Sequence, residues 1–317
     1  MSKKHAYLII AHEKFEQLLF LIELLNHPRN DIYLFIDVKV EDSRITDLKE
    51  KITALNLISM VSFTDRISVN WGDYSQIQAE MLLFKKAHKN RSYAYYHLLS
   101  GVDLPLVSQD TIHQFFDKHQ GKEFLTIVSK ESFERNKIYD RVRIHYWAPH
   151  ISERTFSNKL IGKIFQKIIR SSEFYIKRIC SADKFKTFGT ALGYASNWVS
   201  ITDELVTILI NEESWIRDVF SRSLFCDELF IPTIINKYGW ESRIYYSKGM
   251  KNDSEEFQGN LRYINWWDGS PYTWTDSNED FFSLEKAITR GHFFARKFDI
   301  QAYPATVDFI KARSKFS

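Results

Sequence analysis

Two acidic residues stand side by side in a stretch that is otherwise largely apolar. The stretch is SLFCDELFIPTIINKYGW, residues 223–240, and the pair is Asp227 and Glu228. A carboxylate held among apolar side chains can take a proton from a substrate, so the pair is a candidate for acid–base chemistry. Acids also favour the N-termini of helices, and the pair could instead cap the helix predicted for the isoleucine-rich run that follows.

A second group with chemical potential lies near the end of the chain. In FFARKFD, residues 293–299, the cations Arg296 and Lys297 are flanked by three phenylalanines. Positive charges in an apolar setting act more strongly on an anion than they would in water. The alternative is the exposed end of a helix, where a positive charge is also favourable.

Most familiar catalytic motifs are missing. The chain has no G-x-G-x-x-G, no Walker lysine loop and no G-x-S-x-G. AHEKFEQ begins like a zinc protease motif, but Glu16 stands where the second histidine belongs. No Asp-x-Asp triplet is present to clamp a divalent metal on a diphosphate. We therefore expect no metal and no other cofactor.

The elements that must position these groups alternate between strands and helices. Strands are predicted for residues 6–11, 31–38, 59–64 and 93–100, and helices for residues 13–26 and 74–88. This alternation predicts an α/β fold with a mostly parallel central sheet flanked by helices. In such sheets ligands bind beyond the carboxyl ends of the strands, which is where His12, Asp37 and the turn containing Asp103 fall.

Residues 159–187 have a different composition from the rest. The segment contains eight Lys or Arg and only two acids. Apolar residues recur in it at helical spacing, namely Ile161, Ile164, Phe165 and Ile168. This pattern predicts a basic amphipathic helix that can lie on an anionic membrane surface. The alternative is a helix that packs its apolar face on the protein core and exposes its basic face to water.

Composition sets the wider limits. The 317 residues are 44% hydrophobic and 26% charged, which fits a single domain over 1–317 with a nucleotide-binding half (1–130) and an acceptor and catalytic half (131–317). A net charge of +3 gives no support to a nucleic-acid binder. Two cysteines without metal spacing, and no predicted secretory or membrane-spanning segment, favour a cytoplasmic protein. The basic segment adds the expectation of a peripheral position at the inner face of the cell membrane.

Six ordered blocks resemble one enzyme family. They are WGDYSQIQAEMLLFKKA (71–87), YYHLLSGVDLPL (95–106), SNWVSIT (196–202), CDELFIPTIINK (226–237), LRYINWWDGSP (261–271) and HFFARKFD (292–299). Their order is similar to that in glycosyltransferase family 14, the core-2/I-branching β-1,6-N-acetylglucosaminyltransferases and peptide O-xylosyltransferases. The chain resembles a short bacterial-type member. The resemblance implies a GT-A nucleotide-binding sandwich and an inverting, metal-independent transfer from a UDP-sugar.

The resemblance also assigns roles at the catalytic and donor positions. Glu228 matches the catalytic glutamate, which would take the proton of the acceptor hydroxyl, and Asp227 would support it. Lys297 matches the lysine that contacts the diphosphate, and Arg296 stands beside it. Asp37 is similar to the strand-end aspartate that contacts uridine, and Asp103 is placed similarly.

Two further positions depart from the pattern or concern the acceptor. The family's second diphosphate cation falls near Trp274, so Arg290 and Arg262 are the candidates to replace it. On the acceptor side, the resemblance points to Arg135 in SFERNKIY and to Trp266 as a stacking residue. Trp267 could equally belong to the core.

The function expected from this resemblance is sugar transfer to a saccharide or lipid-linked oligosaccharide, most readily of N-acetylglucosamine, in cell-surface polysaccharide or glycoconjugate synthesis. Xylose is the alternative donor sugar, because the motifs are shared by both branches. An alternative of another class is a non-catalytic carbohydrate-binding protein on the same scaffold. Nucleic-acid binding is the weakest alternative, since no recognised module surrounds the basic segment.

Overall fold

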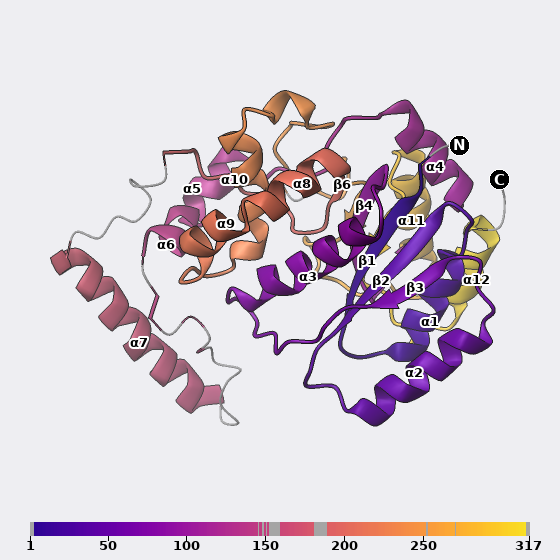
Figure 1. Cartoon of the computed structure of the whole chain (residues 1–317), viewed down its shortest axis with the longest axis horizontal. Coiled ribbons are helices and arrows are strands. Elements are labelled where there is room, and N and C mark those ends of the chain that lie inside the picture. Colours follow the sequence, from indigo (N-terminus) through magenta and orange to yellow (C-terminus); the bar gives the residue numbers. More distant parts are fainter. Residues whose placement is uncertain are drawn as a thin grey trace.

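A five-stranded sheet forms the centre of the protein (Figure 1). The computed structural model describes residues 3–144, 146, 147, 149, 151, 159–180, 189–251, 253–269 and 271–314. The strand order is β3-β2-β1-β4-β6, and all pairs are parallel except that β6 runs antiparallel to β4. The strands are β1 (His5–Ala11), β2 (Asn30–Ile36), β3 (Met60–Phe63), β4 (Tyr95–Ser100) and β6 (Ser200–Thr202).

Both faces of this sheet are covered, which is why its inner strands are almost continuously apolar. Along β1, Ala6 and Leu8 enter one buried cluster while Tyr7 and Ile9 enter the other. Side chains of successive strand residues point to opposite faces, so a single strand supplies both cores. Each cluster draws residues from both halves of the chain, for example Leu34 with Phe294 on one side and Leu98 with Ile234 on the other.

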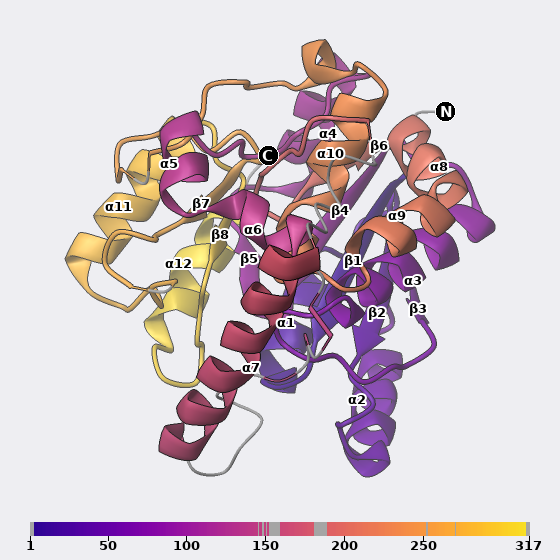
Figure 2. The same ribbon diagram turned by 90° about the vertical axis from the view of Figure 1, so that its left-hand side faces the viewer.

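The helices divide between the two faces (Figures 1 and 2). One cluster contains side chains of α3 (Ser75–Asn90), α8 (Asp203–Asn211), α9 (Glu213–Phe220) and α10 (Phe230–Lys237). The other contains side chains of α1 (Phe15–Leu24), α2 (Asp42–Ala54), α4 (Gln109–Lys118), α11 (Asn278–Thr289) and α12 (Ala305–Ser314). A second sheet, ordered β5-β8-β7, belongs to this side and consists of β5 (Asp103–Pro105), β8 (Phe294–Arg296) and β7 (Arg262–Ile264).

Shorter elements and one isolated helix complete the chain. The short helices α5 (Lys130–Arg135) and α6 (Ile138–Arg143) precede α7 (Lys159–Cys180), and the 3₁₀ turns are η3 (Cys226–Glu228) and η4 (Glu241–Arg243). Helix α7 lies at the left edge of the molecule in Figure 1, away from the central sheet, and therefore on the side that faces the viewer in Figure 2. Within the described residues no helix has the length and apolar character needed to cross a membrane.

The predicted fold class is confirmed, since a mostly parallel sheet lies between helices. The four predicted strands and both predicted helices are present with shifted ends. Helix α2 and the small sheet were not predicted, and β7 of that sheet lies inside a stretch that is otherwise rich in loops. Strand β6 and the helices α4, α5, α6, α8, α9, α11 and α12 were not predicted individually either. Residues 181–187 of the predicted basic segment lie outside the described residues.

Candidate active site

A large cleft opens at the carboxyl ends of the central strands. Its volume is about 1460 Å³, and its lining includes His12 after β1, Asp37 after β2 and Ser100 at the end of β4. Gly101 permits this convergence, because a Cβ at this position would lie 2.9 Å from the Cβ of Ala11. The cleft therefore occupies the carboxyl edge of the sheet, where the alternation of strands and helices in the sequence predicted a ligand site.

The acidic pair lies in the wall of this cleft, within the turn η3. Phe225, immediately before the turn, has left-handed backbone angles (φ 47°, ψ 47°), and its ring packs edge-on against Trp71 at 4.7 Å. A non-glycine residue in this region costs about 1–3 kcal/mol and often marks a functional site. The capping interpretation receives no support, because the N-cap of α10 is Leu229 and no side chain caps that helix.

Glu228 is held by an ion pair and remains accessible. Arg141 Nη1 donates to Glu228 Oε2 at 2.7 Å, and the side chain of Glu228 is 30% exposed. The guanidinium of Arg141 lies 5.3 Å from the ring centres of both Tyr194 and Phe225. Because the arginine is fixed between two aromatic rings, it holds the carboxylate in one place at the cleft surface.

Asp227 faces inward. It is 7% exposed, and its Oδ2 accepts a hydrogen bond from Gln76 Nε2 of α3 at 3.1 Å. Burial raises the pKa of Asp227 to about 7, and the negative charge of Glu228 acts in the same direction. The two neighbouring acids thus differ in environment, since Asp227 is buried whereas Glu228 is partly exposed and paired with an arginine.

A third acid, Glu80, lies one helical turn beyond Gln76 and also lines the cleft. It is 1% exposed, and its Oε2 has no hydrogen-bond partner among the described residues. Burial raises its pKa well above the ordinary value, and the charge of Asp227 adds to that shift. The pKa shift indicates that Glu80 retains a proton at a pH where an ordinary glutamic acid is ionised.

Replacing Glu80 with glutamine should change how stability depends on pH. The pKa of Glu80 is raised in the folded state, so stability is highest below the unfolded pKa and falls as pH rises towards the folded pKa. The slope reaches about 1.4 kcal/mol per pH unit. Glu80→Gln should therefore lose less stability than the wild type over the range from about pH 5 upward, where an ordinary glutamic acid is ionised. Thermal unfolding across this range measures the effect.

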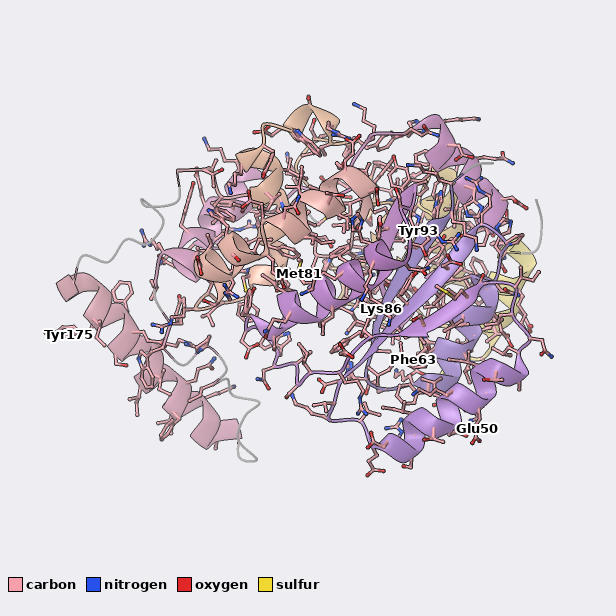
Figure 3. The ribbon with its side chains drawn as sticks, in the orientation of Figure 1. Glu50, Phe63, Met81, Lys86, Tyr93 and Tyr175 are labelled. Atoms are coloured by element: carbon pink, nitrogen blue, oxygen red, sulfur yellow. The ribbon has the colours of Figure 1, made fainter. Side chains whose placement is uncertain are left out.

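The control for this experiment is Glu50→Gln, because Glu50 is an exposed residue on α2 (Figure 3). It should leave the pH dependence unchanged. If the unfolding temperatures of Glu80→Gln and the wild type changed in parallel with pH, Glu80 would not be the group that retains a proton in the folded state.

Arg296 is fixed by three neighbours. Its Nη1 donates to Asp103 Oδ1 at 3.0 Å and to the Ser100 hydroxyl, and its guanidinium lies 4.3 Å from the centre of the Trp198 ring. The side chain is 15% exposed, so it lines the cleft with little freedom to move. The alternative of an exposed helix end is wrong, because Arg296 lies in strand β8.

Lys297 is the less constrained cation. It lines the cleft and forms no ion pair with any described residue. Burial lowers its pKa, and the neighbouring charge of Arg296 acts in the same direction. The indole of Trp274 packs behind this strand, where its Nε1 donates to Arg296 O at 3.0 Å and its main-chain N donates to Lys297 O at 2.8 Å. Trp274, which stands near the position of the family's second cation, therefore carries no charge itself but holds the main chain of Arg296 and Lys297 in place.

The structure corrects the suggestions about neighbouring cations. Arg262 is 1% exposed and donates to the main-chain oxygens of Leu98 and Val199, so it is a buried structural residue. Arg290 pairs with Glu255 outside the cleft lining. Neither can replace the second diphosphate cation in this conformation.

An acidic triplet that could bind a divalent metal also lies away from the cleft. Asp253–Glu255 has the sequence Asp-x-Glu, but its residues are not part of the cleft lining.

Asp103 also lies elsewhere than expected. It is 1% exposed and accepts hydrogen bonds from Ser100 N at 2.9 Å and from Arg296. It is not part of the cleft lining, so it orients Arg296 rather than facing a ligand. Asp37 does line the cleft, although its oxygens accept hydrogen bonds from the main-chain N–H groups of Lys39 (2.8 Å) and Val69 (3.1 Å).

The two predicted acceptor residues reach the same cleft from different elements. Arg135, at the end of α5, and Trp266, after β7, both line it, and Trp266 is 36% exposed. Trp267 packs against the core beside Tyr263, with ring centres 5.6 Å apart. The adjacent tryptophans thus divide between the cleft and the core.

Sequence reasoning missed several residues of the cleft. Gln76 and Glu80 carried a detectable signal, because they are four residues apart in a predicted helix inside one of the resembling blocks. Arg141 and Tyr194 carried none that separates them from other surface or core residues, and Trp198 carried only its place in the resembling block 196–202. These three residues reach the cleft only because elements that are distant in the sequence come together in the fold.

Comparison with known proteins identifies the family. The sequence profile of the Core-2/I-Branching enzyme family matches residues 5–283. The chain belongs to this family. The matched region includes the acid pair of the branching-enzyme domain, and ends before Arg296 and Lys297.

A relative of this branching-enzyme chain is a xylosyltransferase, sqv-6 of Caenorhabditis briggsae, which is 20% identical over 295 residues. The alignment covers 86% of this chain and 32% of that protein. The chain thus spans about a third of the length of the curated relative that it matches.

Proposed function

We propose that the protein is an inverting glycosyltransferase that moves a sugar from a UDP-sugar to a hydroxyl of a saccharide acceptor. The observation that carries this proposal is a single cleft lined by Glu228, by Lys297 and by the acceptor candidates Arg135 and Trp266. A base, a cation and an aromatic platform are the groups that such a transfer requires. Membership of the branching-enzyme family supports the same reaction.

The chemistry assigns a different task to each side of the cleft. Glu228 takes the proton of the incoming hydroxyl while the anomeric carbon–oxygen bond of the donor breaks. Attack comes from the face opposite the leaving group, so the anomeric configuration inverts. The leaving diphosphate already carries negative charge, so Lys297 and Arg296 stabilise it and no acid has to protonate it. Asp37 is the candidate contact for the uridine.

We expect the reaction to need no divalent metal, since Arg296 and Lys297 both line the cleft and can neutralise the charge of a departing diphosphate. Among the described residues, the only cluster of three possible metal-binding groups consists of His27, Asp110 and His113, and it lies outside the cleft lining. The donor sugar is proposed to be N-acetylglucosamine. Xylose is a second candidate because the relative from C. briggsae is a xylosyltransferase.

The test combines donor choice, stereochemistry and metal removal. The protein is incubated with UDP-N-acetylglucosamine or UDP-xylose and a panel of saccharide acceptors, in the presence of EDTA. We expect a product with a β-linkage from one donor, identified by NMR, and a rate in EDTA equal to that in added Mg²⁺. An α-linked product would contradict inversion, loss of turnover in EDTA would contradict metal independence, and binding of UDP-sugars without transfer would indicate a carbohydrate-binding protein.

The acceptor is proposed to be a saccharide or lipid-linked oligosaccharide used in cell-surface polysaccharide or glycoconjugate synthesis, at the inner face of the cell membrane. The support for that location is the basic amphipathic sequence of residues 159–187.

A further inference from the structure

Helix α7 presents a continuous apolar face to solvent. Large apolar side chains that are at least 49% exposed recur along the helix, namely Leu160, Ile164, Phe165, Ile168, Phe174, Tyr175 and Ile176. A single exposed apolar residue is ordinary, but a row of seven on one helix is not. In Figure 3, Tyr175 marks the outer side of this helix, away from the sheet.

The opposite face of α7 holds the helix to the protein. Ile169 and Glu173 are 5% and 2% exposed. Arg170 donates to Glu173 Oε2 at 2.8 Å and to the main-chain O of Ile151 at 3.0 Å, and its guanidinium lies 5.1 Å from the centre of the Tyr146 ring. The alternative that α7 packs its apolar face on the core is therefore wrong for Ile164, Phe165 and Ile168, which are exposed.

The charge of α7 indicates what can cover this face. Its 22 residues contain six Lys or Arg and one acid, and that acid is buried. A second copy of the chain would bring two basic helices together, which like-charge repulsion opposes. An anionic lipid surface offers both a layer for the apolar side chains and negative charge for the flanking cations.

We propose that α7 is a membrane-docking helix, which lies in the headgroup region of an anionic bilayer with Leu160, Ile164 and Ile168 inserted. Lys163 and Lys167 are exposed on the same helix and would contact the headgroups. Arg170 has a different role, because its contacts fix α7 to the rest of the protein. If the proposed function is correct, docking would hold the cleft next to a lipid-linked acceptor.

The experiment measures sedimentation of the full chain with vesicles of phosphatidylcholine, alone or mixed with phosphatidylglycerol. The wild type should bind the mixed vesicles, more weakly at high salt, and bind neutral vesicles poorly. Lys163→Gln with Lys167→Gln should weaken binding about fivefold for each lysine removed. Replacing Leu160, Ile164 and Ile168 together with serine should weaken it by at least about tenfold.

Matched controls separate this face from general surface effects. Ile58 and Phe282 are 69% and 62% exposed, close to the values of 73%, 61% and 62% for Leu160, Ile164 and Ile168. Serine at those two positions should leave binding unchanged, as should glutamine at the exposed Lys86 and Lys89 of α3. All variants should unfold at the temperature of the wild type.

Three results would overturn the proposal. They are a wild type that stays in the supernatant with mixed vesicles, serine variants of α7 that bind as well as the wild type, and a dimer by light scattering that the same serine variants convert to a monomer. Glu228→Gln should bind vesicles normally, so this test is independent of sugar transfer.

Discussion

Glu228→Gln should reduce sugar transfer by about 10²- to 10⁴-fold, the usual contribution of a general base. An amide has the shape of the carboxylate but cannot accept the proton of the acceptor hydroxyl. The substitution keeps an oxygen for the 2.7 Å hydrogen bond from Arg141, so the turn η3 should stay in place. The loss should appear in kcat, measured with saturating donor and acceptor.

Two comparisons make this prediction specific. UDP should bind Glu228→Gln with the affinity of the wild type by calorimetry, because the cations of the donor side are untouched. The control is Glu213→Gln, which removes a half-exposed partner of Lys85 outside the cleft lining and should retain full activity. Full transfer by Glu228→Gln would remove the proposed base and leave the acid pair without a catalytic role.

Lys297→Ala should produce the second large effect, a loss of about 10²- to 10³-fold in kcat together with weaker UDP binding. Lys297 lines the cleft without an ion pair to any described residue, whereas Arg296 is already bound to Asp103 and Ser100. The lysine is therefore the cation with charge to offer a departing diphosphate. Steady-state kinetics and UDP calorimetry on the variant measure both losses.

The pH dependence supplies an independent test of the same lysine. Burial and Arg296 lower the pKa of Lys297 below its ordinary value of 10.5. The protonated form carries the charge, so activity should fall as pH rises through this lowered pKa. Lys297→Arg should keep its charge throughout and remove the alkaline decline.

The control for the Lys297→Ala variant is Lys14→Ala. Lys14 also lines the cleft, but it is paired with Asp299 at 2.6 Å. The Lys14→Ala substitution should therefore lower kcat much less than Lys297→Ala does. Equal losses for the two variants, or an alkaline decline that persists in Lys297→Arg, would contradict the assignment of the diphosphate contact to Lys297.

The sheet was predictable because its signals are local. Alternating apolar runs and helical patterns indicate a buried parallel sheet, and residues that follow strands must lie at its carboxyl edge. This is why His12 and Asp37 were expected near a ligand and do line the cleft. Helix α2 was missed because only three of its residues are buried, so its apolar pattern is weak.

The sequence alone determined the fold class, the strand-end position of the cleft and the family blocks that contain Glu228 and Lys297. Only the tertiary structure decided the partners, because contacts between distant segments leave no local pattern. The β5–β8 pairing places Asp103 opposite Arg296 and outside the cleft lining, whereas Arg262 is buried in the neighbouring strand β7. The structure also decided which face of α7 is exposed, since the same amphipathic sequence is compatible with packing on a core or lying on a membrane.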